Sequence, residues 1–160
     1  MVVTATHNGS ANFIVHMVKG SDTEYLINEL GAFNGQALLE EATPGRYRVV
    51  VDADGAWVLK FAQGLTPTKR IPGSLTGQSS RVIAVRASSH LQPVVTATHR
   101  GQSNFIVHLV GYGKQYGYTE YVFNEIGNFK GQTLIDDVPA GTYYVAVDAS
   151  GGSWSLRFTR

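Results

Sequence analysis

Short runs in which apolar and polar residues alternate recur along the chain, and Gly, Pro, Asn and Asp separate them. In one such run Trp57, Leu59 and Phe61 alternate with Val58 and Lys60. A period of two predicts β-strands with one buried face. The predicted strands cover residues 2–7, 12–18, 25–28, 36–40, 46–52 and 57–61. Their lengths and turn spacing predict an all-β protein of antiparallel β-sandwich, jelly-roll-like modules.

The whole pattern occurs twice. Val2–His7 recurs as Val94–His99, and Asn12–His16 recurs as Asn104–His108. About half of the aligned positions are identical, which is far beyond chance for such a span. The chain therefore consists of two tandem copies of one module.

The boundaries between the modules follow from composition. Residues 64–80 contain Pro67, Pro72 and many Ser and Thr residues, which is typical of a linker. We therefore predict a first module over 1–63 and a second module over 81–160.

The second module has a leading strand, Arg81–Arg86, whereas no counterpart precedes Met1 in the first. The first module is then short by one strand, and we expect an open edge at Val2, Val3 and Thr4. Unpaired backbone groups at such an edge are a template for strand addition by another chain.

Composition narrows the classes of partner. The net charge is only +1, and the Lys and Arg residues are scattered along the chain, which argues against nucleic acid as a partner. No apolar run reaches the ~20 residues of a membrane helix, so we expect no membrane insertion. The chain has no cysteine, which excludes disulfides and zinc–thiolate sites. A predicted strand follows Met1 directly, where a secretory signal would have a basic and then an apolar segment.

The repeated motifs resemble a known kind of domain. The series T-H-x-G-x-x-N-F-I-V, N-E-[IL]-G-x-F-x-G, G-x-Y-x-V-x-V-D-A and G-x-W-x-L resembles an uncharacterised β-sandwich domain of bacterial secreted and surface proteins. It is distantly similar to the pre-peptidase C-terminal modules appended to secreted enzymes. The resemblance implies a non-catalytic accessory or surface module, and it assigns no functional residue.

Two sequence patterns are candidates for metal binding. Four of the five histidines lie at repeated positions: His7, His16, His99 and His108. On a hairpin about Asn8-Gly9, His16 would lie opposite Val3, away from His7, which favours structural roles over a shared ion. Asp52–Gly55 imitates the opening of a calcium loop, but the closing Glu is absent and a hairpin turn explains the same residues. We expect no metal site and no cofactor.

Candidates for catalysis or sugar stacking have plainer explanations. Glu29 and Glu125 occupy one position in separate modules, and no serine lies in a nucleophile motif, so we expect no enzyme activity. Trp57 and Trp154 could stack on a sugar ring. Their alternation with Leu and Phe places them on the core face instead.

The largest difference between the repeats is a Tyr- and Gly-rich insertion after His108. It contains Tyr112, Tyr116 and Tyr118, and such loops are common at recognition surfaces. Surface tyrosines on a plain turn are the alternative.

These features favour two functions. The first is docking on the protein surface of a larger assembly, for example as a bacteriophage decoration protein of a capsid or tail. The alternative is a carbohydrate-binding accessory module of a secreted bacterial protein, with a surface glycan as its partner. Both place the protein on a virion or at an extracellular surface. The open edge also predicts that copies of the chain form homo-oligomers or exchange strands.

Overall fold

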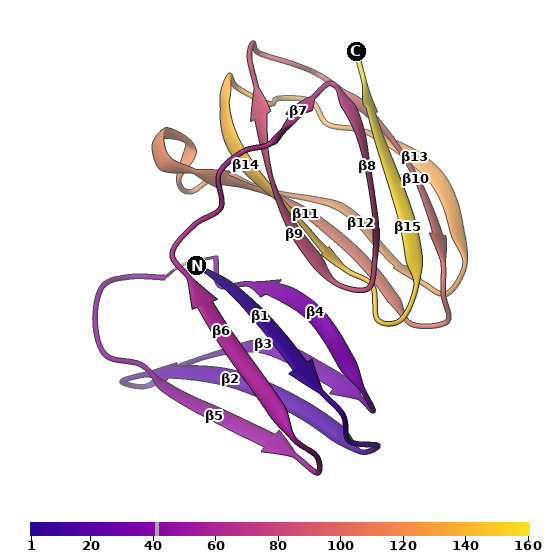
Figure 1. The fold of residues 1–160 in the computed structure, drawn as a ribbon. Helices are drawn as coiled ribbons and strands as arrows, with labels where there is room; N and C mark the ends of the chain where they lie inside the picture. Colours follow the sequence, from indigo (N-terminus) through magenta and orange to yellow (C-terminus); the bar gives the residue numbers. More distant parts are fainter. Residues whose placement is uncertain (41) are drawn as a thin grey trace. The chain divides into compact units, whose positions relative to one another are not determined.

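The computed structural model describes residues 1–40 and 42–160, whose regular secondary structure is almost entirely β-strand (Figure 1). The chain divides into two compact units, Met1–Gly64 and Leu65–Arg160. In the described part of the chain no helix is long and apolar enough to cross a membrane. The predicted all-β antiparallel sandwich class is confirmed.

Unit 1 is a sandwich of two three-stranded sheets with the orders β4-β1-β6 and β3-β2-β5. Its strands are β1 (Val2–His7), β2 (Asn12–Lys19), β3 (Asp22–Leu30), β4 (Phe33–Leu38), β5 (Arg48–Ala53) and β6 (Trp57–Ala62). Each strand turns alternate side chains inward, because successive residues of a strand point to opposite faces. Phe13, Val15, Ile27 and Phe33 form the centre of its core.

Unit 2 is a larger sandwich of a four-stranded sheet, β13-β10-β15-β8, and a five-stranded sheet, β12-β11-β14-β9-β7. The strands are β7 (Lys69–Ile71), β8 (Gly73–Gln78), β9 (Arg81–Ala87), β10 (Val94–Arg100), β11 (Asn104–Tyr112), β12 (Thr119–Ile126), β13 (Phe129–Leu134), β14 (Gly141–Asp148) and β15 (Ser153–Thr159), with a short 3₁₀ turn, η1 (Gly113–Gln115). Phe105, Tyr143, Trp154 and Phe158 are buried at its centre.

The segment 64–80, expected as a linker, is instead largely part of unit 2. It contains β7 and β8, and β8 pairs with β15 along its full length. The strand expected over 81–86 is β9, which pairs with β14. Unit 1 has no counterpart of β7, β8 or β9, so it is short of three strands rather than one.

The open edge of unit 1 does not lie at Val2, Val3 and Thr4, and that prediction is wrong. β1 is the central strand of its sheet, where Val2 lies opposite both Leu38 and Ala62. Val2 and Val3 are fully buried as a result. The leading strands of unit 2 add to β14 and β15 rather than to β10, and the corresponding edges of unit 1 are therefore β5 and β6.

Two predicted hairpins are crossovers between sheets. β1 pairs with β4 and β6, whereas β2 pairs with β3 and β5. The Asn8-Gly9 turn therefore carries the chain from one sheet to the other, and Asn8 Oδ1 accepts a hydrogen bond from the Ala56 amide. β5 and β6 likewise belong to different sheets. The hairpin that does form joins β2 to β3 through Gly20, whose φ of 62° suits glycine.

The two tryptophans differ because of the missing strands. Trp154 is only 3% exposed, and its Nε1 donates to the Ser79 carbonyl at 2.9 Å. Gly77 of β8 lies against its indole, where a Cβ would clash. Trp57 occupies the same position in unit 1 but is 47% exposed. The expected burial holds for Trp154 and is wrong for Trp57, because no strand covers it.

Candidate functional site

The outer face of the sheet β3-β2-β5 carries an exposed aromatic residue beside a histidine. Phe13 and Val15 of β2 point into the core, so His16 points outward. Opposite it on β3 lies Tyr25, with the two ring centroids 5.0 Å apart. Tyr25 is 66% exposed, so most of its ring is open to solvent.

Unit 2 repeats this pair at the same place. His108 of β11 lies opposite Tyr121 of β12, with ring centroids 4.3 Å apart. Tyr121 is 70% exposed. In both units the register of the strand pair shifts immediately before the histidine. A bulge of this kind redirects a side chain, and here it sets the tyrosine opposite the histidine.

An exposed asparagine lies close to each pair on the same sheet face. Asn28 of β3 is opposite Ile14, and Asn124 of β12 is opposite Ile106. We call each group of three the Tyr–His platform. The platforms consist of His16, Tyr25 and Asn28 in unit 1 and of His108, Tyr121 and Asn124 in unit 2. Each combines one aromatic ring with side chains that form hydrogen bonds.

A carboxylate lies beside the platform of unit 2. Burial raises the pKa of Asp148, while a hydrogen bond from Ser80 and the nearby His108 lower it. The Ser80 hydroxyl donates to Asp148 Oδ1 at 3.0 Å. Ser80 lies between β8 and β9, which have no counterpart in unit 1. Asp52, the counterpart of Asp148, therefore has no such donor and is exposed.

The other repeated histidines are structural. His7 Nδ1 lies 2.9 Å from the Gly31 carbonyl, and His99 Nδ1 lies 2.7 Å from the Gly127 carbonyl. Because a carbonyl only accepts, each Nδ1 carries a proton. Each buried ring also stacks on a phenylalanine of β2 or β11. Hydrogen bonding at the end of the sandwich explains why these histidines recur.

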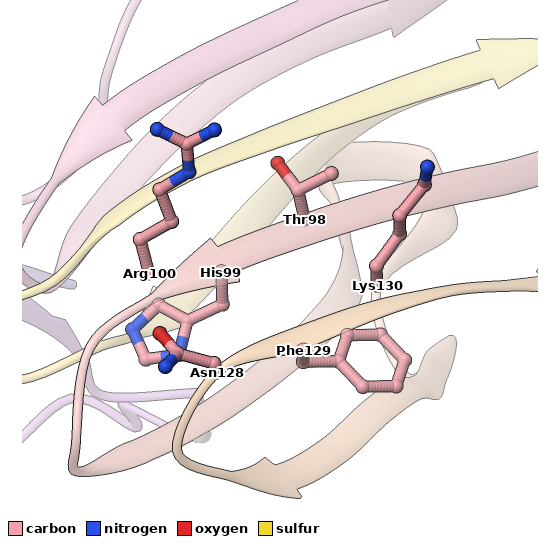
Figure 2. Close-up of a pocket in the computed structure, with 6 residues that line it drawn as sticks. All are labelled: Thr98, His99, Arg100, Asn128, Phe129 and Lys130. Atoms are coloured by element: carbon pink, nitrogen blue, oxygen red, sulfur yellow. The ribbon is translucent and has the colours of Figure 1, made fainter.

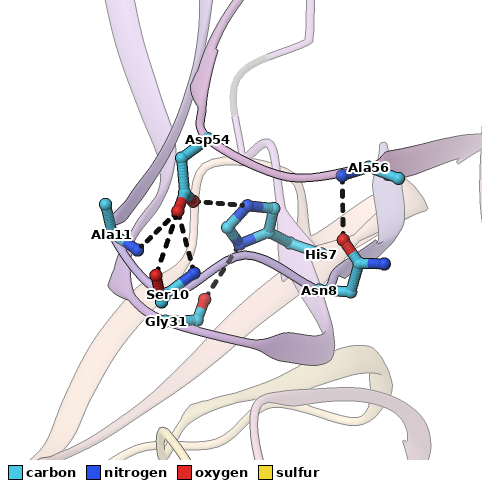
Figure 3. A network of polar contacts seen from close by, with 7 residues as sticks. All are labelled: His7, Asn8, Ser10, Ala11, Gly31, Asp54 and Ala56. Atoms are coloured by element: carbon cyan, nitrogen blue, oxygen red, sulfur yellow. Dashed lines mark hydrogen bonds and ion pairs between the residues drawn. The ribbon is translucent and has the colours of Figure 1, made fainter.

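In unit 1 the carboxylate of Asp54 completes this arrangement (Figure 3). Its Oδ1 lies 3.3 Å from His7 Nε2, and its Oδ2 accepts hydrogen bonds from the amides of Ser10 and Ala11 and from the Ser10 hydroxyl. The backbone hydrogen bond from Ser10 is the largest cause of a lowered pKa of Asp54. The residues that imitate a calcium loop therefore fasten the crossover between β1 and β2.

The histidines do not gather around one point. His7 lies inside the sandwich and His16 on its outer face, so their rings do not converge. Among residues 1–40 and 42–160 no three His, Asp or Glu side chains come together as metal ligands would. Glu29 and Glu125 occupy equivalent positions on β3 and β12, opposite Phe13 and Phe105 respectively.

A shallow pocket of about 520 Å³ lies at one end of β10 and β13 (Figure 2). Its lining residues are Thr98, His99, Arg100, Asn128, Phe129 and Lys130. Two of them are cationic, and the Nδ1 of His99 is already bonded to Gly127. Of the residues singled out in the sequence, the pocket contains only His99.

The tyrosine-rich insertion extends the β11–β12 hairpin and is anchored at two points. The Tyr118 hydroxyl donates to the Asp137 carbonyl at 2.7 Å, and Gln115 Nε2 donates to the Ala140 carbonyl at 3.0 Å. Tyr118 thus packs against the core, and burial raises its pKa to about 12. Tyr116 is 64% exposed, and Tyr112 is partly exposed beside Tyr144.

No protein-family model and no curated protein matches the sequence. Among solved structures, the chain is similar to the pre-peptidase C-terminal domain of a collagenase from Bacillus anthracis, with 13% sequence identity and a TM-score of 0.43. The match covers 61% of this chain and 100% of that domain. That domain is of the kind that the repeated motifs resemble, and no residue role is transferred from it.

The sequence contained a signal for the platforms that a search for catalytic or metal motifs misses. Tyr25 recurs as Tyr121, although plain alternation would place both on the face of the buried Ile27 and Phe123, because the bulge that turns them outward is not visible in the sequence. What the sequence lacked was the pairing of β2 with β3. Only that pairing shows that His16 lies beside Tyr25.

Proposed function

We propose that the chain is a non-catalytic accessory module of an extracellular bacterial protein, and that it binds carbohydrate through the Tyr–His platform of each unit. A tyrosine ring offers an apolar face on which the C–H face of a pyranose can pack. The neighbouring histidine and asparagine can donate to and accept from the sugar hydroxyls.

The observation that supports this proposal is the recurrence of an exposed tyrosine beside a histidine at one register position in both units. A side chain that is about two-thirds exposed adds little to the stability of a sandwich. About half of the aligned positions differ between the repeats. Retention of Tyr25 and Tyr121 under that divergence favours recognition over packing.

Two platforms on one chain also favour a polymeric ligand. When one platform is bound, the other experiences a high effective concentration of the same chain of sugars. A polysaccharide would then bind more tightly than an oligosaccharide that spans one platform.

The test is a depletion assay of the full chain with insoluble cellulose, chitin and xylan, followed by titration with soluble oligosaccharides of the polymer that is bound. We expect Tyr25→Ala and Tyr121→Ala each to weaken binding to the polymer about tenfold, through lost stacking and lost avidity. The double variant should lose binding.

Tyr116→Ala is the matched control, because Tyr116 is equally exposed but lies outside both platforms. It should bind as the wild type does. Failure to bind any of the three polymers, or unchanged binding by the double variant, would contradict the proposal.

The second candidate function is docking on the protein surface of a larger assembly, of which a capsid or tail decoration protein is one case. The anchored insertion favours it, because Gln115 and Tyr118 hold the loop in place while Tyr116 stays exposed. A preorganised aromatic side chain binds a partner at low entropic cost. Replacement of Tyr112 and Tyr116 by Ser should abolish attachment to such an assembly and leave polysaccharide binding unchanged.

A further inference from the structure

Unit 1 leaves both of its sheets open on one side. β5 and β6 are the last strands of their sheets, and residues 54–56 join them directly. In unit 2 the equivalent strands, β14 and β15, continue into β9 and β8. Two neighbouring rows of backbone donors and acceptors in unit 1 are thus without the strands that pair with them in unit 2.

Large apolar side chains are exposed along these two edges. Phe61 is 45% exposed, whereas its counterpart Phe158 is 2% exposed. Val49 and Val58 are exposed as well. Unpaired backbone next to exposed apolar side chains is the combination that favours strand addition.

Exchange of the segment β8–β9 between copies does not close the edge. β8 and β9 are consecutive strands in different sheets, and the described part of the chain has one such segment for two sandwiches. A segment donated to unit 1 would therefore leave a unit 2 in another copy without it. A partner that brings strand edges of its own avoids this loss, and unit 1 of a second copy has two such edges.

The side chains of β5 suit antiparallel pairing with a second β5. The strand reads Arg48-Val49-Val50-Val51-Asp52, a cation and an anion at either end of three valines. Pairing centred on Val50 would set each Arg48 opposite Asp52 of the second copy. Opposite charges directly across two strands stabilise the pair.

The side chains of β6 have the same symmetry. Pairing centred on Leu59 would set Trp57 of one copy opposite Phe61 of the other, with the two Leu59 side chains between them. Aromatic cross-strand pairs also stabilise antiparallel sheets. Both aromatic residues lose their exposed surface in this arrangement.

Unit 2 does not have this symmetry, although the repeats are otherwise similar. The position of Arg48 is occupied by Tyr144, whose hydroxyl accepts a hydrogen bond from the Leu65 amide within unit 2. The position of the exposed Val58 is occupied by Ser155. The repeats therefore differ on the strands that are open in one unit and covered in the other.

We propose that unit 1 pairs with unit 1 of a second copy about a two-fold axis, β5 to β5 and β6 to β6. The two three-stranded sheets of each copy then join into two continuous six-stranded sheets. Such an interface is isologous, because the same surface is used on both subunits and the assembly closes as a dimer. This proposal does not depend on carbohydrate binding.

Charge reversal tests the register. In sedimentation velocity on the full chain over roughly 1–100 µM, a range that suits transient to stable interfaces, we expect a reversible dimer. Arg48→Asp and Asp52→Arg should each raise the dimer dissociation constant about tenfold or more, because like charges then face each other twice. The double variant that carries both changes should restore the wild-type value. Lys130→Asp, the same change of charge on an edge strand of unit 2, should have no effect.

A second measurement needs no variant. Hydrogen exchange of the wild type should show amides of β5 and β6 that are protected above the dissociation constant and exchange faster below it. The proposal is overturned if the chain is a monomer throughout this range, or if the single reversals leave its association unchanged. It is also overturned if a peptide of residues 69–90, which contains β8 and β9, binds the wild-type chain and protects the same amides. That last result would identify two consecutive strands from another protein as the occupant.

Discussion

Truncation of the two tryptophans should have unequal effects, although they occupy equivalent positions. Burial of a whole tryptophan removes up to about 250 Å² from water, and truncation of such a residue to alanine costs about 3–5 kcal/mol. Trp154 is 3% exposed and donates to Ser79, so Trp154→Ala should cost the full amount. Trp57 is 47% exposed, so Trp57→Ala removes about half of that buried area and should cost about 2 kcal/mol.

Calorimetry of the full chain measures the difference, with the two units followed as separate transitions. For a domain of this size each kcal/mol shifts the midpoint by roughly 4–8 °C. Trp154→Ala should therefore lower the unit 2 transition by more than about 12 °C, and Trp57→Ala should lower the unit 1 transition by about 8–16 °C. Because the two ranges of midpoint shift overlap, the comparison should be made with the free energies of unfolding measured in urea.

The measurement belongs at concentrations at which the chain is monomeric, because a dimer would bury Trp57. Equal losses of free energy for the two variants in the monomer would refute the reasoning. They would mean that coverage by β8 and β9 is not what distinguishes the environments of Trp57 and Trp154.

Four further predictions concern single contacts. The pKa of Asp54 is lowered, mainly by the hydrogen bond from the Ser10 amide. The ionised carboxylate therefore stabilises unit 1 above the unfolded pKa near 4, and this stabilisation is lost as pH falls through the folded pKa. The stability of Asp54→Asn should consequently depend less on pH in acid unfolding. Gly77→Val should lower the stability of unit 2 and not that of unit 1, as seen by urea unfolding, because the new side chain would meet the buried indole beneath it. The pKa of Tyr118 is raised to about 12, so the unfolded state ionises first and stability should fall between pH 10 and 12. Tyr118→Phe removes its bond to Asp137 and should cost about 1 kcal/mol at neutral pH, by chemical denaturation.

The duplication and the all-β class followed from the sequence because alternation and self-similarity are local signals. Alternation assigns each residue to a face but does not name the neighbouring strand. The Asn8-Gly9 turn illustrates the limit. It has the residues of a tight hairpin, but Asn8 bonds to Ala56 and the strands on either side enter different sheets.

The environment of a residue also depended on strands far away in sequence. Alternation placed Trp57 and Trp154 on the core face in the same way. Only Trp154 is covered, because β8 lies beside β15 in unit 2. The platforms were missed for a related reason, since the contact between His16 and Tyr25 arises from a bulged strand pair.

The sheet order of unit 1 also has a mechanical consequence. β1 and β6 are antiparallel neighbours, and Val2 at the start of one lies opposite Ala62 at the end of the other. A load applied between residues 1 and 64 would therefore pull at one end of this strand pair. The hydrogen bonds of an antiparallel ladder lie perpendicular to the strands, so they would break one after another instead of sharing the force. Unit 1 should unzip under tension, from Val2 and Ala62 towards His7 and Trp57.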